Sequence, residues 1–148
     1  MSAERQQRIL DLLQKKRRST RLPALVAAWA ALGTRISPLS DERQREIVHC
    51  LRAAGPFTLK PMPTIDSALL AFADQFEMVV VVEWDANEHP AALISTEALV
   101  RSAAKLSSIY RDGFWLADPT LGSALVVSFE DDRAEVEIAT LKLPYAQV

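Results

Sequence analysis

Hydrophobic positions follow a helical spacing through the first half of the chain and a strand-like spacing through much of the second half. Up to Phe76, apolar side chains recur three or four residues apart, the pattern of amphipathic helices. Pro23 suits a first helical turn, and Gly33 suits the position just after a helix end. The pattern predicts four helices: Ala3–Lys16, Leu22–Leu32, a segment from the N-cap Ser40 to Gly55, and one that Thr64 begins.

Strand patterns dominate after Phe76. Met78–Val82 is a continuous apolar run, which predicts a strand covered on both faces and central in its sheet. Ala91–Ile94 is expected to form a brief strand, followed by a fifth helix that runs to Tyr110. Three more strands are expected at Phe114–Ala117, Ser123–Phe129 and Ala134–Leu141, with Glu130–Arg133 as the hairpin tip between the last two.

These elements predict an α+β fold, with a helical N-terminal half packed on a mainly antiparallel C-terminal sheet of about four to five strands. The length of 148 residues, with 49% hydrophobic and 24% charged residues, fits a single globular domain. Within residues 1–148 we distinguish a basic helical part (1–55), a Pro-rich connector (57–63) and an acidic α/β part (64–148). The prolines make the connector a linker or an edge strand.

The sequence carries no sign of a membrane or secreted protein. No apolar run approaches the ~20 residues that cross a bilayer. The N-terminus carries Glu4, Arg5 and Arg8 and lacks the apolar stretch of a signal peptide. Cys50 is the single cysteine, so no internal disulfide can form. We therefore expect a cytoplasmic protein.

Charge is divided unevenly along the chain, although the net charge is only −2. Residues 1–60 hold twelve Lys/Arg and five Asp/Glu, a balance of +7, whereas residues 61–148 hold five Lys/Arg and fourteen Asp/Glu, a balance of −9. The two halves are therefore expected to present different surfaces. An acidic face repels nucleic acid and steers basic proteins toward it.

The basic N-terminal part allows a second interpretation. Lys15–Arg18 is either a nucleic-acid contact or a solvated helix end whose cations complement the helix dipole. Three successive helices suggest a helix-turn-helix, but the link Gly33–Ser40 is longer than the usual tight turn. A regulatory or nucleic-acid-binding protein that uses residues 1–52 remains the alternative function.

Catalytic and metal-binding patterns are weak. His49 and Cys50 are adjacent, so on a helix their side chains point about 100° apart and cannot form a nucleophile–base pair, which favours a buried apolar role for Cys50. Neither a zinc-ligand spacing nor a nucleotide-binding glycine loop occurs. Paired carboxylates for acid–base catalysis are conceivable at Glu83, Asp85 and Glu88. We expect neither a metal nor a cofactor, and no enzyme activity.

The second half resembles the small immunity proteins of contact-dependent growth inhibition and other bacterial polymorphic toxin systems. The resemblance rests on VVVVEWD, the helix Ser95–Tyr110 and DGFWLADPTLGSALVVSFEDD, and covers roughly residues 76–140. It implies a compact cytosolic α+β protein that binds and neutralises one cognate toxin. It assigns no function to individual residues.

If the partner is a basic toxin such as a nuclease, the acidic turns and strand ends are the expected binding surface. The last strand is also expected to have one solvent-exposed acidic face. The alternative is that these acids only keep the protein soluble. The candidate partner-binding residues are Glu83, Asp85, Glu88, Asp112, Asp118, Glu130, Asp131, Asp132, Glu135 and Glu137.

Overall fold

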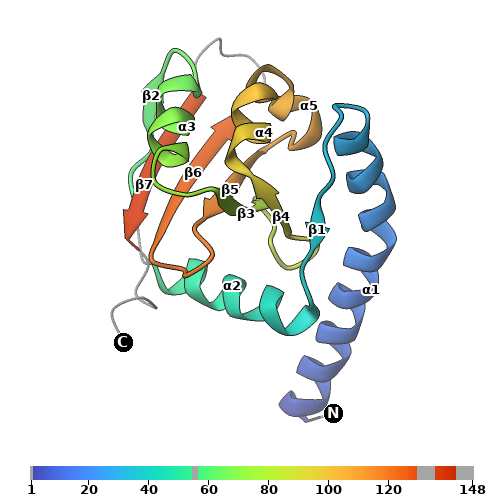
Figure 1. Cartoon of the computed structure of the whole chain (residues 1–148). Coiled ribbons are helices and arrows are strands. Elements are labelled where there is room, and N and C mark those ends of the chain that lie inside the picture. Colours follow the sequence, from blue (N-terminus) through green and yellow to red (C-terminus); the bar gives the residue numbers. More distant parts are fainter. Residues whose placement is uncertain (1, 55–56, 130–135, 143–148) are drawn as a thin grey trace.

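The computed structural model describes residues 2–54, 57–129 and 136–142. It is a mixed α+β fold in which one sheet of seven strands carries helices on both faces (Figure 1). The helices are α1 (Ala3–Ala30), α2 (Asp41–Ala53), α3 (Asp66–Ala73), α4 (Thr96–Arg101), the 3₁₀ helix η1 (Ala103–Lys105) and α5 (Leu106–Ile109). The strands are β1 (Ser37–Pro38), β2 (Lys60–Met62), β3 (Met78–Glu83), β4 (Ala92–Ser95), β5 (Gly113–Ala117), β6 (Ser123–Phe129) and β7 (Val136–Lys142).

The strand order is β1-β4-β3-β5-β6-β7-β2, and all neighbouring strands are antiparallel. Strand β3 lies between β4 and β5, with Val80 opposite both Leu93 and Ala117. Its four valines are buried, and alternate ones point into different cores. The prediction that this apolar run forms a covered, central strand is therefore confirmed.

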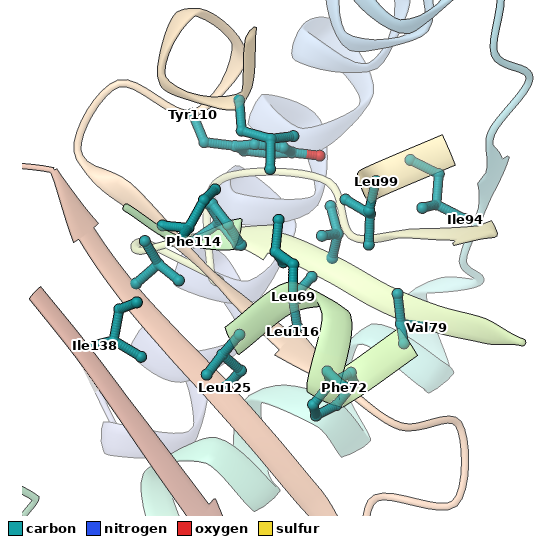
Figure 2. Close-up of a cluster of buried hydrophobic side chains, with 14 of the residues drawn as sticks. Leu69, Phe72, Val79, Ile94, Leu99, Tyr110, Phe114, Leu116, Leu125 and Ile138 are labelled. Carbon is teal, nitrogen blue, oxygen red and sulfur yellow. The ribbon is translucent and has the colours of Figure 1, made fainter. Parts of the chain in front are cut away.

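Two hydrophobic clusters hold the layers together. On one face of the sheet, α1, α3, α4 and α5 contribute to a cluster in which Leu69 and Phe72 of α3 pack with Leu116 and Leu125 of the sheet (Figure 2). On the other face, α2 packs Ile47 and its neighbours on the opposite side chains of the same strands. Helices therefore bury apolar surface on both sides of each central strand, which stabilises the three-layer arrangement.

Helix α1 is one continuous helix, so the prediction of two helices broken between Lys16 and Leu22 is wrong. Pro23 lies inside it, and a proline there removes one backbone hydrogen bond and costs about 3 kcal/mol. Contacts on both sides of the proline offset this cost: Trp29 is fully buried, and Arg18 is largely buried. Although α1 has 28 residues, no helix in the described ranges is long and apolar enough to span a membrane.

The sheet is larger than predicted because two short strands from the first half of the chain form its edges. The residue pair Ser37–Pro38 pairs with β4, and Lys60–Met62 of the Pro-rich connector pairs with β7. Both edge strands contain a proline, which edge positions tolerate because one side of the strand needs no backbone donor. The connector is thus an edge strand rather than a linker.

Two finer predictions differ from the structure. The fifth helix is not continuous to Tyr110 but consists of the short segments α4, η1 and α5. The face of β7 that carries Glu137 is not fully exposed, because Ala139 on the same face is buried in the cluster under α2.

Candidate functional site at the end of strand β3

The loop after β3 is a compact turn that carries three of the predicted acids. Asp85 organises it: its carbonyl accepts hydrogen bonds from the amides of Glu88 (3.2 Å) and His89 (3.1 Å), and its Oδ1 accepts one from the amide of Asn87 (3.2 Å). The Asn87 bond is of the Asx type, and together the three bonds fix a short loop without further secondary structure. The acids therefore stand at defined positions relative to the sheet.

Gln44 of α2 fixes the loop from the other side, and sequence reasoning missed this residue. Its Nε2 donates to the carbonyls of Ala86 (2.8 Å) and His89 (2.7 Å), and its Oε1 accepts from the amide of Ala91 (2.8 Å). The side chain is only 3% exposed. A buried amide with these three partners rigidifies the loop, because each loss would leave a buried polar group unpaired.

Helix α1 lays its basic residues on the same loop. Arg17 forms an ion pair and a hydrogen bond with Glu88. Arg18 donates to the carbonyl of Asn87 (2.6 Å) and forms an ion pair with Asp41 of α2 (3.3 Å). Arg21 donates to the carbonyl of Glu88 at 3.1 Å. Part of the basic half of the sequence therefore neutralises part of the acidic half within one molecule.

Glu83 and His89 form a carboxylate–imidazole pair, with His89 Nδ1 2.9 Å from Glu83 Oε2. On the other side of the ring, Arg21 Nη1 lies 3.2 Å from His89 Nε2. Because a guanidinium only donates, this contact requires Nε2 to accept, which places the ring proton of the neutral imidazole on Nδ1, toward Glu83. Nε2, the nitrogen that would act as a base, is thus occupied by a cation.

A cavity of about 300 Å³ borders this pair, between α1 and the loop. Its wall includes Leu25, Glu83, His89 and Tyr110. Burial raises the pKa of Glu83, the neighbouring His89 and Arg21 lower it, and the charges of Asp112 and Asp85 raise it further, with a net increase. Because Glu83 pairs with Phe114 across β3 and β5, Asp85 and Asp112 lie at the same end of these strands as Glu83.

Trp84 lies between Glu83 and Asp85 and is half-buried. Its ring packs edge-on against Trp115, with ring centroids 5.4 Å apart. Gly113 makes room for it: a Cβ at this glycine, whose φ is +123°, would collide with the Trp84 indole and with the carbonyl oxygen of Val127. We call the group of Glu83, Trp84, Asp85 and Asp112 the β3 acidic end.

The other predicted acids are not part of this group. Glu88 is paired with Arg17, as described above, and Glu137 lies on β7, half-buried and with interactions of its own. Asp118 follows β5 at the opposite end of the paired strands, since Glu83 pairs with Phe114 and Val80 with Ala117. Glu130, Asp131, Asp132 and Glu135 lie outside the described residues.

Asp118 holds the turn between β5 and β6. Its carboxylate accepts hydrogen bonds from the amides of Thr120 (2.8 Å), Gly122 (3.0 Å) and Ser123 (2.6 Å), and the residue is 2% exposed. Burial raises the pKa of Asp118, but the hydrogen bonds from Thr120 and Ser123 outweigh it, so the net pKa is lowered. This geometry gives the side chain a structural role and leaves little of it within reach of a partner.

The other candidate chemical groups do not come together. Cys50 is buried in the cluster under α2, as predicted, and burial raises the pKa of its thiol. His49 is exposed. Within the part of the chain that the structure describes, no three His, Cys, Asp or Glu side chains are grouped so that they could hold a metal ion.

Comparison of the chain with known protein families, with curated proteins and with solved structures returns no match.

Proposed function

We propose that this chain is a non-enzymatic, cytoplasmic binding protein that neutralises a cognate bacterial toxin, and that the β3 acidic end contacts a basic surface of that toxin. The observation that carries the proposal is the state of the acids at this end. Asp85 and Asp112 are exposed, whereas Asp118 and Glu88 are bound within the chain. Two acids therefore remain free to meet a partner.

The surroundings of these acids suit a protein interface. Trp84 is a partly exposed aromatic residue beside them, and interface hot spots are enriched in Trp near charged neighbours that a partner desolvates. The loop is fixed from below by Gln44, so little conformational entropy is lost when a partner binds. The Glu83–His89 pair supports binding rather than catalysis, because Arg21 occupies the nitrogen that would act as a base.

Nucleic-acid binding by the N-terminal helices has less support. Arg17, Arg18 and Arg21 donate to carboxylates or carbonyls of the same chain, and Lys15 lies 3.3 Å from Asp41. These cations would have to exchange internal partners for phosphates. Retention on heparin at moderate salt would favour this alternative.

A charge-reversal experiment tests the proposal. The chain is used to capture a partner from its source cells, and binding kinetics of the purified pair are measured for the wild type and for Asp85→Lys/Asp112→Lys at two salt concentrations. We expect the association rate to fall about tenfold and to depend less on salt, because the acids steer a basic partner.

The matched control is Asp74→Lys/Glu77→Lys. These two exposed acids precede β3, at the end opposite the β3 acidic end, and the double variant changes the net charge by the same amount. It should change the association rate much less. Equal effects of the two double variants would show that only net charge matters, and no effect of the first would remove the β3 acidic end from the interface.

A further inference from the structure

The first half of α1 has an unusual surface for a helix of a monomeric domain. Ile9, Leu10, Leu12 and Leu13 are between 42% and 65% exposed, although they are the main apolar residues of this segment. Figure 1 shows this part of α1 reaching beyond the body of the domain, alongside α2. Exposed apolar side chains gathered on one segment indicate an interaction surface.

A groove of about 500 Å³ runs between this part of α1 and α2. Leu10 and Leu12 of α1 and Val48 of α2 supply its apolar surface. Its cationic side chains come from both helices: Arg8, Lys15, Arg18, Arg45 and Arg52. The acids that line it are Asp11 and Asp41, so formal charge in the groove is +3 without His49.

The cations of the groove differ in how far they are already engaged. Lys15 and Arg18 both form ion pairs with Asp41, and Arg18 is 9% exposed with an Nε atom that lacks a hydrogen-bond partner among the described residues. Arg8, Arg45 and Arg52 are exposed, and none of the ion pairs found in the described ranges involves them. Three arginines without an ion pair among the described residues therefore line a mostly polar groove that also carries the apolar side chains of both helices.

We propose that this groove binds an acidic amphipathic helix of a partner protein. Such a helix would place its apolar stripe against Leu10, Leu12 and Val48 and its carboxylates against Arg8, Arg45 and Arg52. Arginine suits this role because its planar fork matches a carboxylate. This site is separate from the β3 acidic end. The groove favours an acidic partner, whereas the β3 acidic end favours a basic one.

Charge decides against two other occupants. Residues 3–18 of α1 hold six Lys/Arg and two Asp/Glu, a balance of +4, so two copies of the chain that pair through this segment would repel each other. A nucleic acid would meet the carboxylates of Asp11 and Asp41 inside the groove, and its phosphates gain nothing from exposed leucines. The lining also includes no Phe, Tyr or Trp on which a base would stack.

The test uses the full chain and three defined probes. The first is a labelled peptide of about 18 residues, long enough to span the groove as a helix, with leucine at i, i+3, i+4 and i+7 and glutamate elsewhere. The second has lysine in place of glutamate, and the third is a single-stranded DNA of about the same number of nucleotides. Binding is followed by fluorescence anisotropy at low and moderate salt.

We expect the acidic peptide to bind with micromolar affinity and to bind at least about tenfold more tightly than the lysine peptide or the DNA. Arg45→Glu/Arg52→Glu should weaken it at least about tenfold, and Leu12→Ser a few-fold. Arg35→Glu/Lys105→Glu, which reverses two exposed cations outside the groove, should leave the affinity within about twofold. Melting temperatures of all variants verify folding, and Leu12→Ser is informative even if a charge reversal destabilises α2.

Three results would overturn the proposal. They are no binding of the acidic peptide at millimolar concentration, tighter binding of the DNA than of the acidic peptide, and equal weakening by the groove and control variants. A concentration-dependent dimer that Leu12→Ser abolishes would also overturn it, since it would make a second copy the occupant.

Discussion

The loop after β3 and the turn after β5 both present acidic residues at sheet ends, yet they use them differently. In the β5–β6 turn, Asp118 is buried and its carboxylate binds backbone amides within five residues of itself. In the β3–β4 loop, Asp85 uses one oxygen for a single amide and remains exposed, while cations from α1 bind its neighbours. The role of an acid in a turn thus depends on which donors the surrounding chain supplies, and not on the turn itself.

The difference separates acids that maintain the fold from acids that are free to bind. A carboxylate with several backbone donors is fully satisfied and gains little from a partner's cation. A carboxylate at a loop surface retains most of its hydration and contributes mainly to long-range steering. Of the predicted interface residues at these two loops, Asp85 belongs to the second class and Asp118 to the first.

Both loops depend on β3 and its neighbours, and the largest effect should come from breaking that strand. Val80 of β3 is buried against α2. Val80→Asp places an unpaired charge there, which costs at least several kcal/mol, comparable with the ~5–15 kcal/mol total stability of a domain. We expect loss of the folded state by circular dichroism. Val26→Asp, the same change at an exposed site on α1, should remain folded, and a folded Val80→Asp variant would contradict the burial of β3.

The second prediction compares the two acids directly. Asp118→Ala leaves the amides of Thr120, Gly122 and Ser123 without their acceptor, and we expect it to lower the free energy of unfolding by about 3 kcal/mol. Asp85→Ala removes a single exposed hydrogen bond and should cost about 0.5 kcal/mol. Urea denaturation of both variants measures the difference. Equal decreases in the free energy of unfolding would show that the two carboxylates contribute equally to the fold.

The lowered pKa of Asp118 predicts a specific pH dependence. Its pKa in the folded state lies below the ordinary value of 3.8, so its ionised form stabilises the fold at neutral pH. This contribution is lost as pH falls from the ordinary pKa through the folded one. The stability difference between wild type and Asp118→Asn should therefore be constant from about pH 7 to about pH 5 and should shrink below about pH 4.

Measuring the difference, rather than the wild type alone, matters because other acids titrate in the same range. The pKa of Asp41 is lowered as well: burial raises it, but Lys15 and Arg18 outweigh that effect. Glu83 has a raised pKa, so its ionisation destabilises the fold as pH rises and acts in the opposite direction. A wild-type to Asp118→Asn difference that stays unchanged down to pH 3 would contradict the role given to Asp118.

The central part of the fold was predictable because its signals are local. Met78–Val82 is apolar at every position, which indicates a strand with two covered faces, and turn residues together with β-branched side chains located β5 and β6. The edge strand Ser37–Pro38 has no such signal, since two residues form it and its hydrogen bonds come from β4. The prediction therefore placed the central strands correctly and missed the strand Ser37–Pro38 at one edge of the sheet.

The candidate site was less predictable because its contacts join distant parts of the chain. The continuity of α1 past Lys16 depends on Arg17 and Arg18, whose partners Glu88 and Asn87 are about seventy residues away. Nothing near Gln44 in the sequence indicates that it holds the β3–β4 loop. Asp85 and Asp118 both accept an amide two residues on, so this Asx-type spacing does not separate them. The further bonds from the amides of Gly122 and Ser123 distinguish Asp118.

The smallest expected effect concerns the clamp of α1 on the β3–β4 loop. Arg17 is half-exposed, and surface ion pairs contribute about 0–1 kcal/mol, so Arg17→Ala should barely change the stability of the domain. The change should nevertheless release the carboxylate of Glu88 from one of its two cations, since Arg21 remains 3.8 Å away. Association with a basic partner should then become slightly faster at low salt and unchanged at high salt.

Arg5→Ala, at an exposed position in the first turn of the same helix, gives the same net charge without freeing Glu88. Identical kinetics for the two variants would show that Glu88 faces no partner, and that the β3–β4 loop contributes through Asp85 alone.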